Sequence, residues 1–368
     1  MARSLSGLTT LRVGGEPRLL LEPATRDEIV DAALDTWASG EEWLLLGGGS
    51  NTVMADEGFD GTVIRIRSSG IAEIASDRAD RVRLRVEAGH DWDALVAHSV
   101  SLGLSGIEAL SGIPGSVGAA PVQNIGAYGQ EVAETLVAID FLDYLTGEVV
   151  RLSADELELG YRWSALKGGR QGVVLAVEFD MAPGGAAPVR YAQLANALGV
   201  ELGTAVDPAA TREAVLGLRA SKGMVLDAGD PDTASAGSFF TNPIVSAAFA
   251  ADLPEGAPRF PVSASALPDR VVPLDGSGGT LQVDPVPREA PQVKLSAAWL
   301  IEHAGIARGF RLPGSSAAIS SKHTLALTNQ GGATADQIAE LARYVQTRVL
   351  AEFGVFLHPE PVLVGVSL

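Results

Sequence analysis

Residues 111–129 constrain the fold of this chain more than any other stretch. They contain five glycines, two prolines and no charged side chain. Because glycine adopts positive φ angles and proline fixes the path of the chain, we expect a rigid, irregular main-chain surface here, neither helix nor strand. The amide side chains of Gln123 and Asn124 and the unshielded backbone would suit a flat, polar, phosphate-bearing cofactor. A glycine-rich surface loop without a ligand is the alternative.

The composition limits the classes of protein to which the chain can belong. With 368 residues, 46% of them hydrophobic, it is long enough for two or three globular domains. Phosphate binding needs clustered basic residues, so the net charge of −18 argues against a nucleic-acid partner. The chain has no cysteine, which excludes disulfides and thiolate chemistry, and its five histidines show no metal-ligand spacing, so we expect no metal.

Two further features concern the location of the protein. No apolar run approaches the ~20 residues that span a bilayer, and the N-terminus lacks a basic region followed by an apolar one. We therefore expect a cytoplasmic protein with no membrane partner.

The first third of the chain predicts a small βαβ unit. A capping box at Thr25 predicts a helix over 26–38, and apolar runs predict strands over 43–46 and 62–66. A glycine turn, residues 47–51, follows the first of these strands, and its amides can cradle a pyrophosphate. The turn lacks the GxGxxG spacing of a Rossmann fingerprint and the lysine of a P-loop, so neither site is supported.

Periodicity predicts most of the remaining elements. Residues 82–88 alternate as a half-buried strand, with Arg83, Arg85 and Glu87 on the polar face. We expect helices over 91–102, 208–220, 294–303 and 335–353, a hairpin of 136–142 with 148–152, a strand over 172–181 and a terminal strand from Phe356. Prolines and glycines predict that 244–290 is mostly irregular, with a flexible part at 276–279.

Five motifs, taken in order, resemble one family. They are GGGSN at 47–51, SGIPGSVGAAPVQNIGAYG at 111–129, YRxSxxK at 161–167, AGSFFTNP at 236–243 and LHPE at 357–360. Together they resemble the UDP-N-acetylenolpyruvoylglucosamine reductases (MurB), in the form with an extra tyrosine-bearing loop. The resemblance runs from residue 10 to residue 365.

The resemblance implies an α+β chain with the two-domain FAD-binding fold of the vanillyl-alcohol-oxidase-like (PCMH-type) flavoproteins and a C-terminal α/β substrate-binding domain. The first FAD-binding subdomain would be residues 1–69, completed by 361–368, and the second 70–225. The substrate-binding domain would be 226–360, with a Pro/Gly-rich insertion at 244–290. The resemblance implies non-covalent FAD as cofactor, with NADPH and a UDP-sugar as small-molecule partners, and we expect a monomer.

The resemblance also implies a set of site residues. Those expected to bind FAD are Gly47, Gly48, Gly49, Ser50, Asn51, Ile113, Pro114, Gly115, Ser116, Gly118, Ala119, Gln123, Asn124, Gly126 and Ala127. Those expected to bind substrate are Tyr128, Tyr161, Arg162, Tyr191, Lys222 and Asn242, and those expected to be catalytic are Arg162, Ser238 and Glu360.

The implied chemistry accounts for the catalytic residue types. FAD would pass a hydride from NADPH to C3 of an enolpyruvyl ether, leaving negative charge at C2 and its carboxylate, and so yield UDP-N-acetylmuramate for peptidoglycan synthesis. Arg162 can stabilise that charge, a protonated Glu360 can donate a hydrogen bond to it, and Ser238 can deliver a proton to C2.

Two departures from the family pattern concern these residues. The spacing between Lys222 and Ser238 is longer than in the best-known members, and Val362 stands where members often have an arginine.

Two other classes of protein are alternatives: a flavoprotein of the same fold with another substrate, and a non-catalytic flavin- or nucleotide-sugar-binding module.

Overall fold

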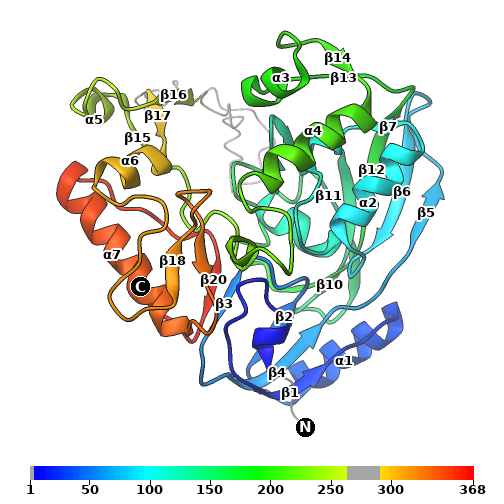
Figure 1. The fold of residues 1–368 in the computed structure, drawn as a ribbon. Coiled ribbons are helices and arrows are strands. Elements are labelled where there is room, and N and C mark those ends of the chain that lie inside the picture. The colour runs from blue at the N-terminus through cyan, green and yellow to red at the C-terminus, as the bar shows by residue number, and fades with distance from the viewer. Residues whose placement is uncertain (1–3, 263–290) are drawn as a thin grey trace, which may run out of the picture.

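The computed structural model describes residues 4–262 and 291–368, and Figure 1 shows how their elements are arranged. A six-stranded sheet lies on the right of that view, the C-terminal helices and strands lie on the left, and a small parallel sheet lies below. Among the described residues, none of the helices has the length and apolarity to cross a membrane.

The small sheet has the strand order β1-β4-β2, and all of its strands are parallel. Its strands are β1 (Pro17–Leu21), β2 (Trp43–Leu46) and β4 (Phe59–Arg65), and α1 (Arg26–Ala38) connects β1 to β2. The helix begins at the predicted capping box, in which Thr25 and Glu28 bond each other's backbone. The sequence prediction found α1, β2 and β4 but missed β1.

The C-terminus returns to this first part of the chain. Strand β20 (Val362–Val364) pairs in parallel with β3 (Thr52–Met54), directly after the glycine turn. The terminal strand is shorter than predicted. It begins only after Pro361, because proline has no N–H to donate to a ladder.

The six-stranded sheet is antiparallel, with the order β11-β10-β12-β6-β5 and β7 paired to β12. Its strands are β5 (Ile71–Ile74), β6 (Val82–Glu87), β7 (Leu104–Ser105), β10 (Leu136–Asp143), β11 (Val149–Ser153) and β12 (Gly172–Pro183). The predicted hairpin is therefore confirmed as β10 and β11. Helix α2 (Trp92–Ser101) buries Trp92 and Leu95 in the core of this sheet, and α1 contributes Ile29 to the same core.

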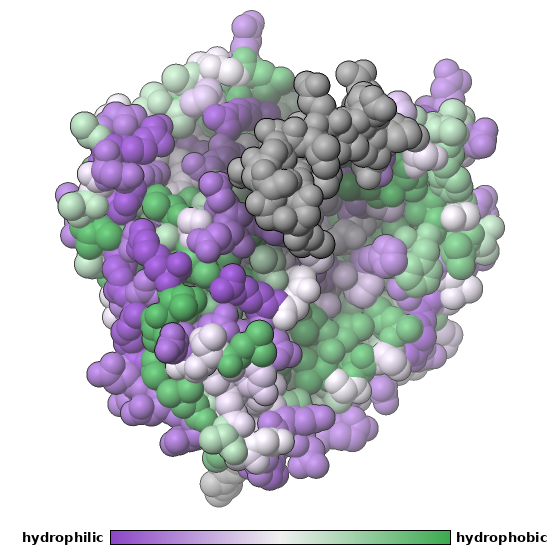
Figure 2. Space-filling view, turned by 180° about the vertical axis from the view of Figure 1, so that it is seen from behind, coloured by the Kyte–Doolittle hydropathy of each residue, from purple (hydrophilic) through white to green (hydrophobic). Residues whose placement is uncertain are grey.

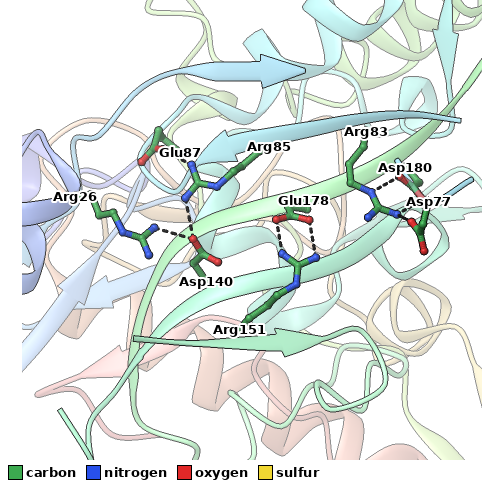
Figure 3. A network of polar contacts seen from close by, with 9 residues as sticks. All are labelled: Arg26, Asp77, Arg83, Arg85, Glu87, Asp140, Arg151, Glu178 and Asp180. Atoms are coloured by element: carbon green, nitrogen blue, oxygen red, sulfur yellow. Dashed lines mark hydrogen bonds and ion pairs between the residues drawn. The ribbon is translucent and has the colours of Figure 1, made fainter. Parts of the chain in front are cut away.

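One face of this sheet carries a series of ion pairs (Figure 3). Arg83 bonds Asp180 through Nε at 2.7 Å, Arg85 bonds Asp140 at 2.8 Å, and Arg151 bonds Glu178. The alternation predicted for β6 placed Arg83 on an exposed face, but Arg83 is buried by its carboxylate partners. In the view from behind, many hydrophilic residues lie on the left, the side of this sheet (Figure 2).

Short elements connect the sheet to its surroundings. The segment after β12 forms β13 (Ala187–Pro188), α3 (Ala192–Leu198) and β14 (Ala205–Val206), followed by the predicted α4 (Pro208–Ala220). The glycine-rich stretch is irregular, as expected, with a 3-10 helix at Val117–Gln123 and the small pair β8 (Gly126–Ala127) and β9 (Gln130–Glu131). The other 3-10 turns are Leu5–Gly7, Glu108–Leu110, Val132–Glu134 and Pro231–Thr233.

The C-terminal part has its own core, which includes Phe239, Leu300 and Ile338. Its elements are β15 (Ile244–Ser246), α5 (Ala247–Ala251), β16 (Arg259–Val262), β17 (Gln292–Leu295), α6 (Ala297–His303), β18 (Ala317–Ile319), β19 (Leu327–Asn329) and α7 (Ala335–Phe353). Helix α7 follows the predicted capping box at Thr334.

Two predictions for this part are corrected. Residues 244–262 are not irregular, because they form β15, α5 and β16, and both strands pair with β17. The predicted helix over 294–303 begins only at Ala297, where Ser296 caps it, since the residues before the cap form β17. The rest of the predicted irregular segment, with the glycines at 276–279, lies outside the described residues.

Candidate active site

A cavity of about 750 Å³ is lined by residues from every part of the fold. The two glycine-rich loops, the strand β2 and the end of α4 contribute to it, as do Ser238 and Glu360 from far along the chain. Its volume lies within the usual range for small-molecule sites. The structure therefore gathers at one cavity most of the residues that the sequence motifs singled out.

The two glycine loops touch each other at one end of this cavity. A Cβ at Gly48 would lie 2.6 Å from Cα of Gly115, and a Cβ at Gly47 would lie 2.4 Å from Oγ of Ser116. Ser50 donates a hydrogen bond of 2.7 Å to the carbonyl of Pro114. A side chain at either Gly47 or Gly48 would prevent this contact, and the glycines of both loops that line the cavity present only backbone to it.

The lining fits FAD by its shape and chemistry. Bare backbone at glycine turns suits a pyrophosphate, because backbone N–H groups can approach the phosphate oxygens closely. Apolar side chains also line the cavity, and these suit the flat ring systems of FAD. They include Trp43, Leu45, Ile113, Phe141 and Val174. Of the residues predicted to bind the cofactor, all but Asn124 line the cavity.

Arg162 and Glu360 form an ion pair at this cavity, with Nε 2.9 Å from Oε1. Arg162 has a φ of 53°, in the left-handed region that non-glycine residues rarely adopt, and its Nη2 donates to the carbonyl of Gly126 at 3.1 Å. Such a backbone persists only where its surroundings hold it. Lys167 does so by donating from Nζ to the carbonyl of Arg162 at 3.0 Å.

Glu360 is held through its backbone as well as through its side chain. Asn51 and Gln123 donate to its carbonyl at 3.3 and 3.2 Å, so both glycine loops contact it. Burial raises the pKa of its carboxyl group, against the opposing effect of Arg162 and Lys167. These two cations supply the positive charge near Glu360.

The position of Ser238 is fixed by its neighbours in the chain. Phe239 donates its N–H to the carbonyl of Leu325 at 2.7 Å and accepts at its own carbonyl from the N–H of Glu360 at 2.9 Å. The segment therefore lies between the residues around β19 and the C-terminal residues, and isolated bridges join Ser235 to Thr328 and Phe240 to Pro359. This arrangement brings Ser238 to the same cavity as Glu360.

A second group of lining residues lies around Tyr128. Its ring meets that of Tyr191 edge to face, with centroids 5.7 Å apart, and Nζ of Lys222 lies 5.6 Å from its centroid. Lys222 also donates to Gln193 at 2.8 Å. Burial lowers the pKa of Lys222, and the nearby Arg219 lowers it further.

Three predicted site residues are not part of the lining. Asn124 is buried, and its side chain bonds Glu131, the carbonyl of Gly160 and the N–H of Ala133, so it stabilises the loop from within. Tyr161 stacks against Lys294, with Nζ 4.6 Å from its centroid. Asn242 accepts a hydrogen bond from the N–H of Ala297 at 2.9 Å, at the start of α6.

Arg219 and His323 are among the lining residues that the sequence analysis missed. Arg219 is buried and donates from Nη2 to the carbonyl of Met224, and nothing among the described residues accepts a hydrogen bond from its Nε. Nε2 of His323 lies 3.3 Å from Oγ of Ser238. A single Arg or His in a sequence gives no sign of such a position, because it depends on the tertiary fold.

Two family models match the chain. Residues 17–153 match an FAD binding domain, and residues 230–364 match the C-terminal domain of UDP-N-acetylenolpyruvoylglucosamine reductase.

Similar proteins bear the same name. The UDP-N-acetylenolpyruvoylglucosamine reductase of Leifsonia xyli is 59% identical, and the alignment covers 99% of both chains. That of Saccharopolyspora erythraea is 51% identical over 99% of this chain and 95% of its own. The crystal structure of the Thermus caldophilus reductase matches with a TM-score of 0.62 and 25% identity, over 99% of this chain and 98% of that one. The chain therefore belongs to the UDP-N-acetylenolpyruvoylglucosamine reductase family.

Proposed function

We propose that the cavity is the active site of this reductase and that Arg162, Ser238 and Glu360 act there on the substrate. As a member of its family, the protein is an FAD-dependent oxidoreductase of peptidoglycan synthesis. It reduces UDP-N-acetylglucosamine enolpyruvate to UDP-N-acetylmuramate, with NADPH as co-substrate. The observation that most supports the proposed site is the meeting of the Arg162–Glu360 pair and Ser238 beside two glycine loops.

The two glycine loops would hold FAD. The chemistry that bound FAD supplies is hydride transfer from NADPH to C3 of the enolpyruvyl group. The backbone of residues 47–51 and 113–119 would bind its phosphates, while Gln123, Gly126 and Ala127 would line the part of the site nearer the substrate. Asn124 would act indirectly, by keeping this loop in shape.

The three polar side chains would manage charge and protons on the substrate. Addition at C3 leaves negative charge at C2 and in the attached carboxylate, and the guanidinium of Arg162 can stabilise it. A substrate carboxylate at Arg162 competes with Glu360, whose raised pKa then favours the protonated acid, which can donate a hydrogen bond. Ser238 gives the proton that forms the new C2–H bond.

Tyr128, Tyr191 and Lys222 would bind the remainder of the substrate. Tyr191 belongs to the 184–207 segment, and its position at the cavity supports the form of the family with an extra tyrosine-bearing loop. Tyr161 and Asn242 would act from behind the lining, near Arg162 and at the start of α6.

We propose the same domain organisation for this function as the sequence predicts. Residues 1–69 with 361–368, and residues 70–225, would form the two FAD-binding subdomains, and 226–360 the substrate-binding domain. The pairing of β3 with β20 supports the return of the C-terminus to the first subdomain. We further propose that the enzyme acts as a cytoplasmic monomer.

The visible spectrum of the purified protein tests this function. We expect a flavin spectrum that NADPH bleaches and that the enolpyruvyl sugar nucleotide restores. A flavin that NADPH bleaches but that this substrate does not restore would indicate a flavoprotein with another substrate. A yellow protein that NADPH does not bleach would indicate a binding module.

A further inference from the structure

We propose that His323 is a positioning residue for Ser238: its Nε2–H donates a hydrogen bond to Oγ and so directs the serine proton into the cavity. The inference rests on the proposed role of Ser238 as the proton donor. The two atoms lie 3.3 Å apart, and both residues line the cavity. Catalytic hydrogen bonds are often this long before the substrate binds.

Backbone hydrogen bonds hold the two side chains opposite each other. His323 lies in the turn between β18 and β19, where Oγ of Ser320 accepts from its N–H at 3.2 Å. Its carbonyl accepts from the N–H of Ala326 at 3.0 Å, and Phe239, next to Ser238, donates to Leu325 at 2.7 Å. The Ser238–His323 contact is thus built into two paired segments of backbone.

The direction of the hydrogen bond follows from the proton that Ser238 must give. A serine hydroxyl has one proton and two acceptor lone pairs. If Nε2 accepted that proton, the hydroxyl would point at the imidazole and away from the substrate. If Nε2–H donates instead, the O–H remains free to face C2.

The same donor stabilises Oγ after proton transfer. The O–H bond breaks, its electron pair stays on Oγ, and the C2–H bond forms at the substrate. The alkoxide then accepts a hydrogen bond from Nε2–H, as an oxyanion does in a preorganised site, and regains its proton from solvent water.

The surroundings of His323 keep its imidazole neutral. Its pKa is lowered to about 4, chiefly by burial; the charges of Lys222, Arg308 and Arg219 contribute to the lowering, and Glu302 opposes it. A neutral imidazole carries one N–H, so near pH 7 it can donate to Oγ without itself serving as the acid. Its effect on the reaction therefore passes through Ser238.

Half-reaction kinetics test the role. His323→Leu replaces the imidazole with an apolar side chain that cannot donate a hydrogen bond. We expect this variant to slow reoxidation of the reduced flavin by the enolpyruvyl substrate ~10–100-fold. Reduction by NADPH should be unchanged. His323→Gln, whose amide can donate to Oγ, should recover most of the rate, and His98→Leu, at an exposed position on α2, should match the unaltered enzyme in both half-reactions.

A double variant separates this role from direct contact with the substrate. In a Ser238→Ala background, His323→Leu should slow reoxidation no further, because its effect passes through the hydroxyl. Additional slowing in that background, or weaker substrate binding with an unchanged rate, would overturn the proposal. If Ser238→Ala alone left reoxidation unchanged, the proposed role of Ser238 would be the part that fails.

A spectroscopic measurement tests the hydrogen-bond direction without turnover. The chain has five histidines, so ¹⁵N-histidine labelling of the FAD-bound enzyme gives few signals, and His323→Gln identifies the one that belongs to His323. We expect the neutral Nε2–H tautomer at pH 7. The Nδ1–H tautomer would contradict the proposal.

Discussion

Nε of Arg162 lies 2.9 Å from Oε1 of Glu360, and the glycine-rich loop contacts both residues, through the carbonyl of Gly126 and the side chain of Gln123. The ion pair thus joins the loop that is proposed to hold the flavin to the residues that are proposed to act on the substrate. Its two members also respond oppositely to an arriving carboxylate, which Arg162 attracts and an ionised Glu360 repels.

This relationship predicts different results for two replacements of Glu360. Glu360→Gln keeps a hydrogen-bond donor and should slow flavin reoxidation by the substrate ~10-fold, whereas Glu360→Ala should slow it ~100-fold or more. Stopped-flow absorbance measures both rates, and Glu352→Gln, at an exposed position on α7, is the control. Equal losses would mean that the carboxyl group has a role other than donation.

Ser238→Ala should separate the two half-reactions. The variant cannot protonate C2, so reoxidation of the reduced flavin by the enolpyruvyl substrate should slow at least ~100-fold, while reduction by NADPH stays nearly intact. Rapid mixing of each substrate with the enzyme gives the two rates separately. If both fell by the same factor, Ser238 would not be the acid.

The contact between the glycine loops predicts that Gly48→Ala prevents FAD binding. The added Cβ would lie 2.6 Å from Cα of Gly115, so the loops would have to separate. The visible absorbance per mole of purified protein measures the bound flavin, and we expect it to be largely lost. A fully yellow Gly48→Ala protein would show that the two loops can separate without loss of the flavin.

Gly217→Ala is the matched control. Gly217 is exposed in α4, and a Cβ there meets nothing within 4 Å. The substitution should keep the flavin and raise the free energy of unfolding by ~0.5–1 kcal/mol, because alanine is the better helix former.

The buried pair of Arg83 and Asp180 predicts a pH-dependent loss of stability. Their side chains are 10% and 8% exposed, so Arg83→Met leaves a buried carboxylate without its partner and should lower the free energy of unfolding by about 3–5 kcal/mol near neutral pH. Urea unfolding measures this change. Arg18→Met, which breaks an exposed pair with Glu41, should change the free energy of unfolding far less.

The sign of the pH effect follows from Asp180. Its pKa is lowered, chiefly by the hydrogen bond from Arg83, so the pair stabilises the fold above the unfolded pKa of ~3.9. That stabilisation is lost as the pH falls through the lower folded pKa. The difference between Arg83→Met and the unaltered protein should therefore shrink in acid, and a difference independent of pH would contradict this account.

Local sequence signals predicted the elements whose ends are marked by capping residues or by regular periodicity. Thr25 and Thr334 begin α1 and α7 as expected, because a capping box acts within four residues of chain. β1, β3 and α3 were missed, because short segments carry too little periodicity to be recognised. The two strands near residue 250 were missed because their stability comes from pairing with β17, beyond the proline-rich segment.

The part of the site formed by the glycine loops was predictable, because glycine alone among the residue types allows such close backbone contact. Glycines at 47–49 and 115 indicate close backbone contact whatever surrounds them, and the structure has that contact. The positions of Arg83, Arg219 and His323 could not be predicted, because each depends on neighbours that the fold supplies from distant parts of the chain. Asn124 shows the opposite case: its side chain suited a ligand, but both its Nδ2 and its Oδ1 bond residues 131, 133 and 160 of the chain instead.

The pairing of β3 with β20 has a consequence for how the protein is made on the ribosome. The turn at 47–51 emerges early, but the carbonyl of Asn51 accepts from the N–H of Val362, and its side chain donates to Glu360, both at the end of the chain. At ~5–20 residues per second, roughly 15–60 s separate the synthesis of these partners. We expect nascent chains to acquire flavin only after release, because the turn lacks these partners until the last residues are made.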